Sequence, residues 1–301
     1  MRMHFLTLKE LSGDEILKTI KKAVEMKKNP KKYYNKLTNK TLAMIFQKTS
    51  TRTRISFESA MTQLGGHAQY LDWRTTNFTL GSLKDEVKCI ARYVDVIMAR
   101  VYKHEDVAAM AEASRVPVIN GLCDKYHPCQ AMADLMTVYE KFGKLKGIKL
   151  AYVGDGNNVC NTLIIGCAKT GMEIRVATPK GYEPLAEVVK YAQDQKNGKV
   201  ILSNDYKQAV KGADVVYTDT WISMGQEADS KKRMDDFKGW TVNPEMMKLT
   251  NNAYFMHCLP AHRGYEVSDE VLDSERSIVY DQARNRLDVQ KAILLMCLGV
   301  K

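Results

Sequence analysis

The chain has 301 residues, 45% of them hydrophobic, which is long enough for two domains that each bury a core. Lys and Arg exceed Asp and Glu by a net charge of +10, which favours anionic partners but is also typical of a solvated basic surface. The 7 cysteines form no CxxC pair, and no stretch has the roughly 20 apolar residues of a membrane span, so we expect a soluble, cytoplasmic protein without a zinc site, disulfide framework or membrane anchor.

Short β-rich runs alternate with helical patterns along the whole chain. An amphipathic helix is predicted within 17–40, where apolar residues recur at helical intervals among lysines. Strands are then predicted at 42–46, 67–72, 96–101, 116–120, 149–154, 173–178, 200–203, 214–219, 253–259 and 277–281, and the first-half helices at 52–64, 82–93, 104–113 and 128–142. This alternation is typical of parallel sheets covered on both faces, so we predict an α/β fold. The Gly- and Lys-rich segment 141–149 is the expected domain boundary.

Hydroxyls and arginines gather after the first predicted strand, in "FQKTSTRTRISFE", residues 46–58. If Ser50 caps the following helix, free backbone N–H groups and the positive end of the helix dipole lie beside Arg52 and Arg54. That combination suits a phosphate or a similar dianion. The alternative is a plain helix cap with solvated arginines.

Two later strands of the first half also end in polar residues. Arg100 closes an apolar strand, where a long cation indicates a ligand or, alternatively, a side chain that reaches solvent at a sheet edge. In "HPCQ", His127 precedes a proline suited to the first turn of a helix, and Gln130 lies in that turn. A lone histidine is more often structural, but a loop between strand and helix is a favoured place for chemistry.

The second half repeats this pattern. "YVGDGNNVCNT" follows a strand but lacks the full G-x-G-x-x-G, because position 159 is valine, so its amides, Asn157 and Asn158, suit a carboxylate better than a dinucleotide. Asp219 ends another strand and is followed by a long polar loop, 223–240, of the kind that acts as a lid. Cys258 ends a third strand, where the alternative is an inert buried thiol.

In this order and spacing, "STRTR", "HPCQ", "DTWISMGQE" and "HCLP" resemble the signature set of ornithine carbamoyltransferases over essentially the whole chain. The resemblance implies two α/β domains with the active site in the cleft between them. It also implies a carbamoyl-phosphate-binding domain at 1–142, an ornithine-binding domain at 147–283 and a last helix, about 284–301, that packs back on the first domain. The implied assembly is a homotrimer whose sites are completed across subunits, acting on carbamoyl phosphate and L-ornithine without cofactor or metal and without nucleic acid or membrane partners.

The same resemblance assigns roles to individual residues. Those implied to hold carbamoyl phosphate are Ser50, Thr51, Arg52, Thr53, Arg100 and Arg286, and those implied to polarise its carbonyl are Thr53, Arg100, His127 and Gln130. Those implied to hold the amino-acid end of ornithine are Asn158, Asp219, Ser223 and Met224, and those facing its side-chain amine are Cys258 and Leu259. Arg100, His127, Gln130, Cys258 and Arg286 are therefore the expected catalytic residues.

Two segments depart from the family pattern. A Glu-Ser pair usually ends the loop that reaches the neighbouring subunit, and here Gly81-Ser82 stands in its place, so Asn77, Thr79 or Lys84 would have to substitute. Arg284 stands where an acidic residue is more usual. Alternative functions are a sister carbamoyltransferase acting on putrescine, aspartate or an acylated ornithine, a catalytically inactive binding homologue, and an NAD-dependent oxidoreductase.

Overall fold

The computed structural model describes residues 3–223 and 227–300, and the chain divides into two compact units. The first unit holds Met1–Met136 together with Arg284–Lys301, and the second holds Thr137–Ala283. Both divisions fall inside helices, namely α5 (Pro128–Phe142) and α12 (Val279–Leu298). Among the described residues, no helix combines the length and the apolar character needed to cross a membrane.

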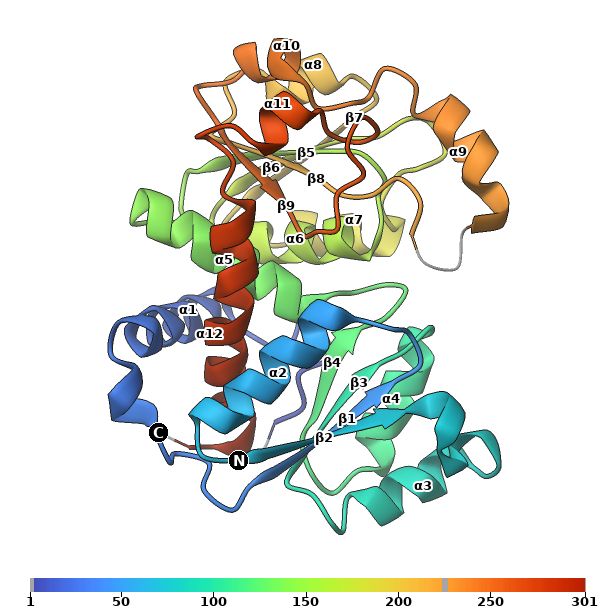
Figure 1. Cartoon of the computed structure of the whole chain (residues 1–301). Helices are drawn as coiled ribbons and strands as arrows, with labels where there is room; N and C mark the ends of the chain where they lie inside the picture. The colour runs from blue at the N-terminus through green and yellow to red at the C-terminus, as the bar shows by residue number, and fades with distance from the viewer. Residues whose placement is uncertain (1–2, 224–226, 301) are drawn as a thin grey trace. The chain divides into compact units, whose positions relative to one another are not determined.

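The first unit is built on a parallel four-stranded sheet with the order β2-β1-β3-β4. Its central strands are buried almost throughout, as expected where helices cover both faces. Figure 1 shows α1 and α2 on one face and α3 and α4 on the other. The elements are α1 (Gly13–Lys28), β1 (Thr41–Phe46), α2 (Thr51–Gln63), β2 (His67–Asp72), α3 (Leu83–Ile90), β3 (Val96–Arg100), α4 (His104–Ala113) and β4 (Val118–Leu122), with short 3₁₀ turns at Pro30–Tyr33, Trp73–Thr75 and Asn77–Thr79.

The second unit contains a parallel five-stranded sheet with the order β7-β6-β5-β8-β9. Helices α6 and α7 cover one face, and α8, α10 and α11 lie on the other (Figure 1). The elements are β5 (Lys149–Val153), α6 (Asn158–Thr170), β6 (Glu173–Ala177), α7 (Ala186–Gln193), β7 (Lys199–Ser203), α8 (Tyr206–Val210), β8 (Val215–Thr218), a 3₁₀ turn at Glu227–Asp229, α9 (Ser230–Asp236), α10 (Pro244–Lys248), β9 (Tyr254–His257) and α11 (Asp269–Leu272). The predicted α/β fold is confirmed.

Both sheets have a topological switch point, where neighbouring strands lead their connections in opposite directions. In the first unit the strand order reverses between β1 and β3, and in the second it reverses between β5 and β8. A crevice opens at the carboxyl ends of two such strands, and ligands of open α/β sheets bind there. The polar residues that follow these four strands are therefore the first candidates for a site.

Local chemistry explains where several helices begin. Ser12 and Glu15 form a reciprocal capping box at α1. Side-chain oxygens of Asp205 and Asn243 each accept a backbone N–H group at the starts of α8 and α10. These caps satisfy donors that the first turn of a helix leaves without partners.

Two predictions from sequence are wrong in the second unit. Residues 277–281 do not form a strand, because only Ser277 makes an isolated bridge, with Phe255, and α12 begins at Val279. A short apolar run does not distinguish a strand from the first turn of a buried helix. Likewise the predicted loop 223–240 contains α9, whose charged side chains pair along the helix, as Lys232 does with Asp236.

Candidate active site

The end of β1 leads directly into the N-terminus of α2. Ser50 is the N-cap, as predicted, because its Oγ accepts a hydrogen bond from the backbone N–H of Thr53 at 3.2 Å. Thr51 and Arg52 lie in the first turn with exposed side chains. Backbone donors, the helix dipole and one guanidinium group therefore converge at the carboxyl end of β1, which is an arrangement that attracts an anion.

The second arginine of "STRTR" points elsewhere. Arg54 Nε lies 3.0 Å from Glu58 Oε1 one turn along α2, and its guanidinium group lies 4.0 Å from the centre of the Tyr70 ring. These contacts hold Arg54 against the surface of its own unit, so it adds less to the charge at the helix N-terminus than the sequence suggests.

Arg286 joins three segments of the first unit that are distant in sequence. This guanidinium group is 4% exposed and donates to Gln130 Oε1 at 2.6 Å and to Thr53 Oγ1 at 3.2 Å. Gln130 Nε2 donates in turn to Asp134 Oδ1 at 2.8 Å, which determines the orientation of the amide. Because Thr53 Oγ1 accepts from Arg286, its own hydroxyl hydrogen remains available to donate. Sequence reasoning missed Asp134, although its position one helical turn after Gln130 was a usable signal.

His127 lies in the same region. Burial lowers its pKa well below the ordinary value, and the positive charges of Arg286, Arg100 and Arg52 act in the same direction. Near neutral pH the imidazole is therefore uncharged, with one ring nitrogen as a donor and one as an acceptor. The structure thus gathers three arginines, assigned from separate motifs, around one neutral histidine.

Asp219 is the centre of a second cluster, at the switch point of the second unit. Its Oδ2 accepts from Asn157 Nδ2 at 2.7 Å, and its Oδ1 accepts from the backbone N–H of Thr220 at 2.8 Å and from Cys258 Sγ at 2.9 Å. Asp219 is only 6% exposed, and its three hydrogen-bond donors hold the carboxylate in one orientation. The ends of β5, β8 and β9 are joined through this single side chain.

The neighbours of Cys258 hold its loop in place. His257 Nδ1 accepts from the backbone N–H of Leu259 at 2.8 Å, and Leu259 has a positive φ of 60°. His257 Nε2 lies 3.3 Å from Glu266 Oε1, with both side chains almost completely buried. Ligand atoms of Asp219, His257 and Cys258 lie within 4.8 Å of one another, but each of these groups takes part in a hydrogen bond within the protein.

The structure places the remaining residues predicted to bind ornithine in different surroundings. Asn158 is the first residue of α6, whereas Asn157 caps that helix by accepting from Val159 N and also contacts Asp219. Ser223 is half-buried and lies just before the gap in the described chain, and Met224 lies outside the described residues. Asn157, one of the two amides that the sequence pointed to, thus bonds to Asp219, whereas the family resemblance named its neighbour Asn158.

A buried ion pair that sequence reasoning missed connects this cluster to the segment after β8. Arg233 of α9 donates to Asp155 Oδ2 at 2.9 Å and to the backbone oxygen of Trp221 at 2.7 Å. Burial raises the pKa of Asp155 to about 6, although the charge of Arg233 opposes this shift. An acidic residue two positions after the buried strand β5 was a signal for a functional carboxylate, but its partner 78 residues away was not visible locally.

This raised pKa predicts how stability depends on pH. The folded pKa of about 6 exceeds the reference value of 3.8, so the contribution of Asp155 is fully present below pH 3.8 and is lost as pH rises through 6. Relative to Asp155→Asn, the free energy of unfolding of the wild type is expected to fall by about 2 kcal/mol between pH 4 and pH 7. Urea unfolding across this pH range measures the difference.

Asp236→Asn is the matched control, because the pKa of this exposed carboxyl is lowered rather than raised, by its hydrogen bond to Lys232. Its difference from the wild type should change with pH in the opposite direction. A parallel pH dependence for wild type and Asp155→Asn would show that Asp155 titrates normally.

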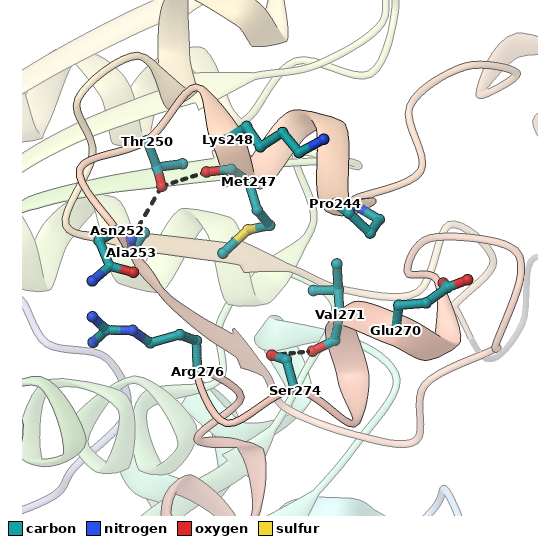
Figure 2. A pocket seen from close by; sticks show the side chains of 10 residues that line it. All are labelled: Pro244, Met247, Lys248, Thr250, Asn252, Ala253, Glu270, Val271, Ser274 and Arg276. Atoms are coloured by element: carbon teal, nitrogen blue, oxygen red, sulfur yellow. Dashed lines mark hydrogen bonds between the residues drawn. The ribbon is translucent and has the colours of Figure 1, made fainter.

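A cavity in the second unit lies away from this cluster. It has a volume of about 490 Å³ and is lined by residues of α10, α11 and the turn before β9, at the amino end of that strand (Figure 2). Its hydroxyl groups are engaged locally, since Thr250 donates to Met247 O and Ser274 to Val271 O, and Lys248 pairs with Glu245. Ligands of parallel sheets bind at the carboxyl ends, so this cavity is not the candidate site.

The two segments that depart from the family pattern have local partners. Lys84 Nζ lies 2.6 Å from Glu112 Oε2, and Thr79 Oγ1 donates to Thr76 O at 3.2 Å, while Leu80 between them is 83% exposed. Arg284 Nε lies 3.2 Å from Asp288 Oδ2, one turn along α12. The positive charge of Arg284 is thus paired with the negative charge of Asp288.

Comparison with known protein families shows to which family this chain belongs. Residues 3–140 match the carbamoyl-P binding domain of aspartate/ornithine carbamoyltransferases, and residues 146–297 match their Asp/Orn binding domain. The chain belongs to the aspartate/ornithine carbamoyltransferase family. The strand-end clusters described above lie within these two family domains, with Ser50, His127 and Arg286 spread over both matches.

Individual carbamoyltransferases are similar over nearly their full length. An ornithine carbamoyltransferase of Caldicellulosiruptor saccharolyticus is 48% identical over 304 residues, covering 98% of this chain and 99% of that protein. The solved structure of ornithine carbamoyltransferase from Pyrococcus furiosus has a TM-score of 0.95 and 49% identity, covering 99% of this chain and 97% of that one. A solved N-acetyl-L-ornithine transcarbamylase has a TM-score of 0.88 and 31% identity, covering 99% of both chains.

Proposed function

We propose that this carbamoyltransferase transfers the carbamoyl group of carbamoyl phosphate to the side-chain amine of L-ornithine, giving L-citrulline and phosphate. The observation that carries the proposal is the cluster in which Arg286 bonds to Thr53 and Gln130 beside a neutral His127. Relatives named ornithine carbamoyltransferase at 48–50% identity support the choice of substrate.

In this proposal the first unit binds carbamoyl phosphate. The phosphate lies at the N-terminus of α2, against the residues Ser50, Thr51, Arg52, Thr53, Arg100 and Arg286. A dianion suits this position because backbone N–H groups and guanidinium groups are both available to it. As phosphate departs with an additional negative charge, the same donors stabilise it.

The carbonyl oxygen of carbamoyl phosphate needs donors of its own. Attack by an amine produces a tetrahedral oxyanion, and one well-placed donor to such an oxygen contributes about 3 kcal/mol. Arg100, His127, Gln130 and the Thr53 hydroxyl are proposed for this role. The lowered pKa of His127 means that its imidazole is neutral near pH 7. A neutral imidazole can donate a hydrogen bond to the carbonyl oxygen without bringing a further positive charge into the site.

The second unit is proposed to bind ornithine. Its side-chain amine resembles that of lysine, with a pKa of about 10.4, so the site must favour the deprotonated form before attack. Asp219 and the backbone around Leu259 supply acceptors at the ends of β8 and β9, with Cys258 bonded to Asp219. Asn158, Ser223 and Met224 are proposed for the α-amino and α-carboxylate groups.

A second candidate substrate is N-acetyl-L-ornithine. Its support is the fold similarity to N-acetyl-L-ornithine transcarbamylase, which is less identical to this chain, at 31%, than the ornithine carbamoyltransferases are. The two substrates differ only at the α-amino group, so residues that contact that group decide between them.

The test is an assay of carbamoyl transfer from carbamoyl phosphate to ornithine, N-acetylornithine, putrescine and aspartate in parallel. Citrulline formation with kcat/KM at least about 100-fold higher for ornithine is the expected result. A preference for another amine would overturn the substrate. Binding of carbamoyl phosphate without turnover of any amine would indicate an inactive homologue.

We also propose a cytoplasmic homotrimer in which the loop around Asn77–Lys84 contacts a neighbouring subunit. Leu80, an apolar side chain of this loop that is 83% exposed, would be covered by such a contact. The pairing of Lys84 with Glu112 within the chain leaves Asn77 and Thr79 as the polar residues better suited to reach a neighbour. The molar mass in solution tests the trimer.

A further inference from the structure

Gln47 is the first residue after β1, at the switch point between β1 and β3. The ladder between these strands ends with Phe46 opposite Arg100. Beyond that pair, the backbone N–H of Gln47 donates to the backbone oxygen of Arg100 at 2.8 Å. The connections that follow two strands at a switch point run in opposite directions, but here the contact continues by one residue beyond the ladder.

The Gln47 side chain continues the contact further. Its Oε1 accepts from the backbone N–H of Tyr102 at 2.7 Å, so one glutamine engages the carbonyl of residue 100 and the amide of residue 102. Its Nε2 lies 3.5 Å from Asp106 Oδ2 in the first turns of α4. On the other side of this segment, Val101 N donates to Leu122 O of β4 at 2.9 Å. The backbone that carries Arg100 is therefore held from both sides.

The position of Gln47 affects anion binding because the chain runs from Gln47 directly into α2, the helix that carries the other anion-binding groups. Only two residues of the chain lie between Gln47, which contacts the carbonyl of Arg100, and Ser50, which accepts from the N–H of Thr53. The distance between Arg100 and the N-terminus of α2 thus depends on how firmly the ends of β1 and β3 are joined. A dianion that contacts both groups binds best when this separation is already correct, because ordering costs are then avoided.

We propose that Gln47 is a positioning residue that holds the Arg100 segment and the N-terminus of α2 at the separation needed to bind phosphate. It does so through the Tyr102 N–H and Arg100 C=O groups and does not touch the substrate. The inference rests on the proposed function only in taking the phosphate of carbamoyl phosphate as the natural ligand.

The test replaces Gln47 with methionine, which has a similar shape but no acceptor oxygen. We expect the Kd for inorganic phosphate, measured by calorimetry, and the KM for carbamoyl phosphate to rise about tenfold each, as for one lost hydrogen bond. The KM for ornithine at saturating carbamoyl phosphate should change less than about twofold. Hydrogen exchange at the Tyr102 amide should become faster.

Gln195→Met is the matched control, since that side chain donates to Tyr191 O within the second unit, and it should leave phosphate affinity unchanged. Gln47→Glu keeps an acceptor for Tyr102 and should retain the slow exchange of that amide. Unchanged phosphate affinity in Gln47→Met, or an equal rise in the KM values for both substrates, would overturn the proposal. Phosphate binding is measured without any amine, so a failure of the ornithine assignment does not affect this result.

Discussion

Replacing Arg286 with alanine is expected to lower kcat/KM for carbamoyl phosphate about 1000-fold, which corresponds to roughly 4 kcal/mol. The guanidinium group bonds to Thr53 and Gln130 at once, so its loss removes a charge from the anion site and a partner from two proposed donors to the carbonyl. Steady-state kinetics with carbamoyl phosphate varied at saturating ornithine measures the loss.

A lysine at position 286 tests whether the charge of Arg286 or the shape of its guanidinium group is responsible for the effect. Arg286→Lys keeps the positive charge, but a single ammonium group lacks the rigid fork that reaches both Thr53 Oγ1 and Gln130 Oε1, so we expect only about a tenfold recovery. Arg284→Ala, two positions earlier on α12 and 54% exposed, is the control and should change kcat/KM less than about threefold. Wild-type kinetics in Arg286→Ala would contradict the proposed phosphate site.

The second large effect is expected at Asp219. Its carboxylate accepts from Asn157, Thr220 and Cys258, whereas the amide of asparagine has one oxygen and an NH₂ group that would face another donor. We therefore expect Asp219→Asn to raise the KM for ornithine about 100-fold, as for losing a hydrogen bond to a buried charge. Phosphate affinity should remain within about twofold of the wild type, as calorimetry can measure.

Asp214 provides the control at the opposite end of the same strand. Its carboxylate accepts from Lys149 N at 2.9 Å and from Asn251 Nδ2 at 3.2 Å, far from the carboxyl end of β8. Asp214→Asn should leave the KM for ornithine unchanged. If both variants lowered ornithine affinity equally, the effect of Asp219→Asn would reflect the stability of the sheet and not the site.

Predictions that rested on local chemistry agree with the structure. The α/β pattern follows from short apolar runs separated by amphipathic ones, and the Ser50 cap follows from a hydroxyl placed before a helical segment. Predictions that required a choice between two local solutions were less successful. The run 277–281 fits a strand and the start of a buried helix equally well, and only the packing of α12 decides between them.

By itself, the sequence determined the class of fold, the positions of most strands and helices, and the polar residues that follow each strand, because these depend on periodicity and on neighbours a few residues apart. Tertiary structure alone decided which of these residues meet. Arg286 bonds to Thr53 across 233 residues, and Asn157 bonds to Asp219 across 62. Such pairs depend on the order of strands in the sheet, which determines which helix termini lie next to each other. A local sequence pattern does not predict that order.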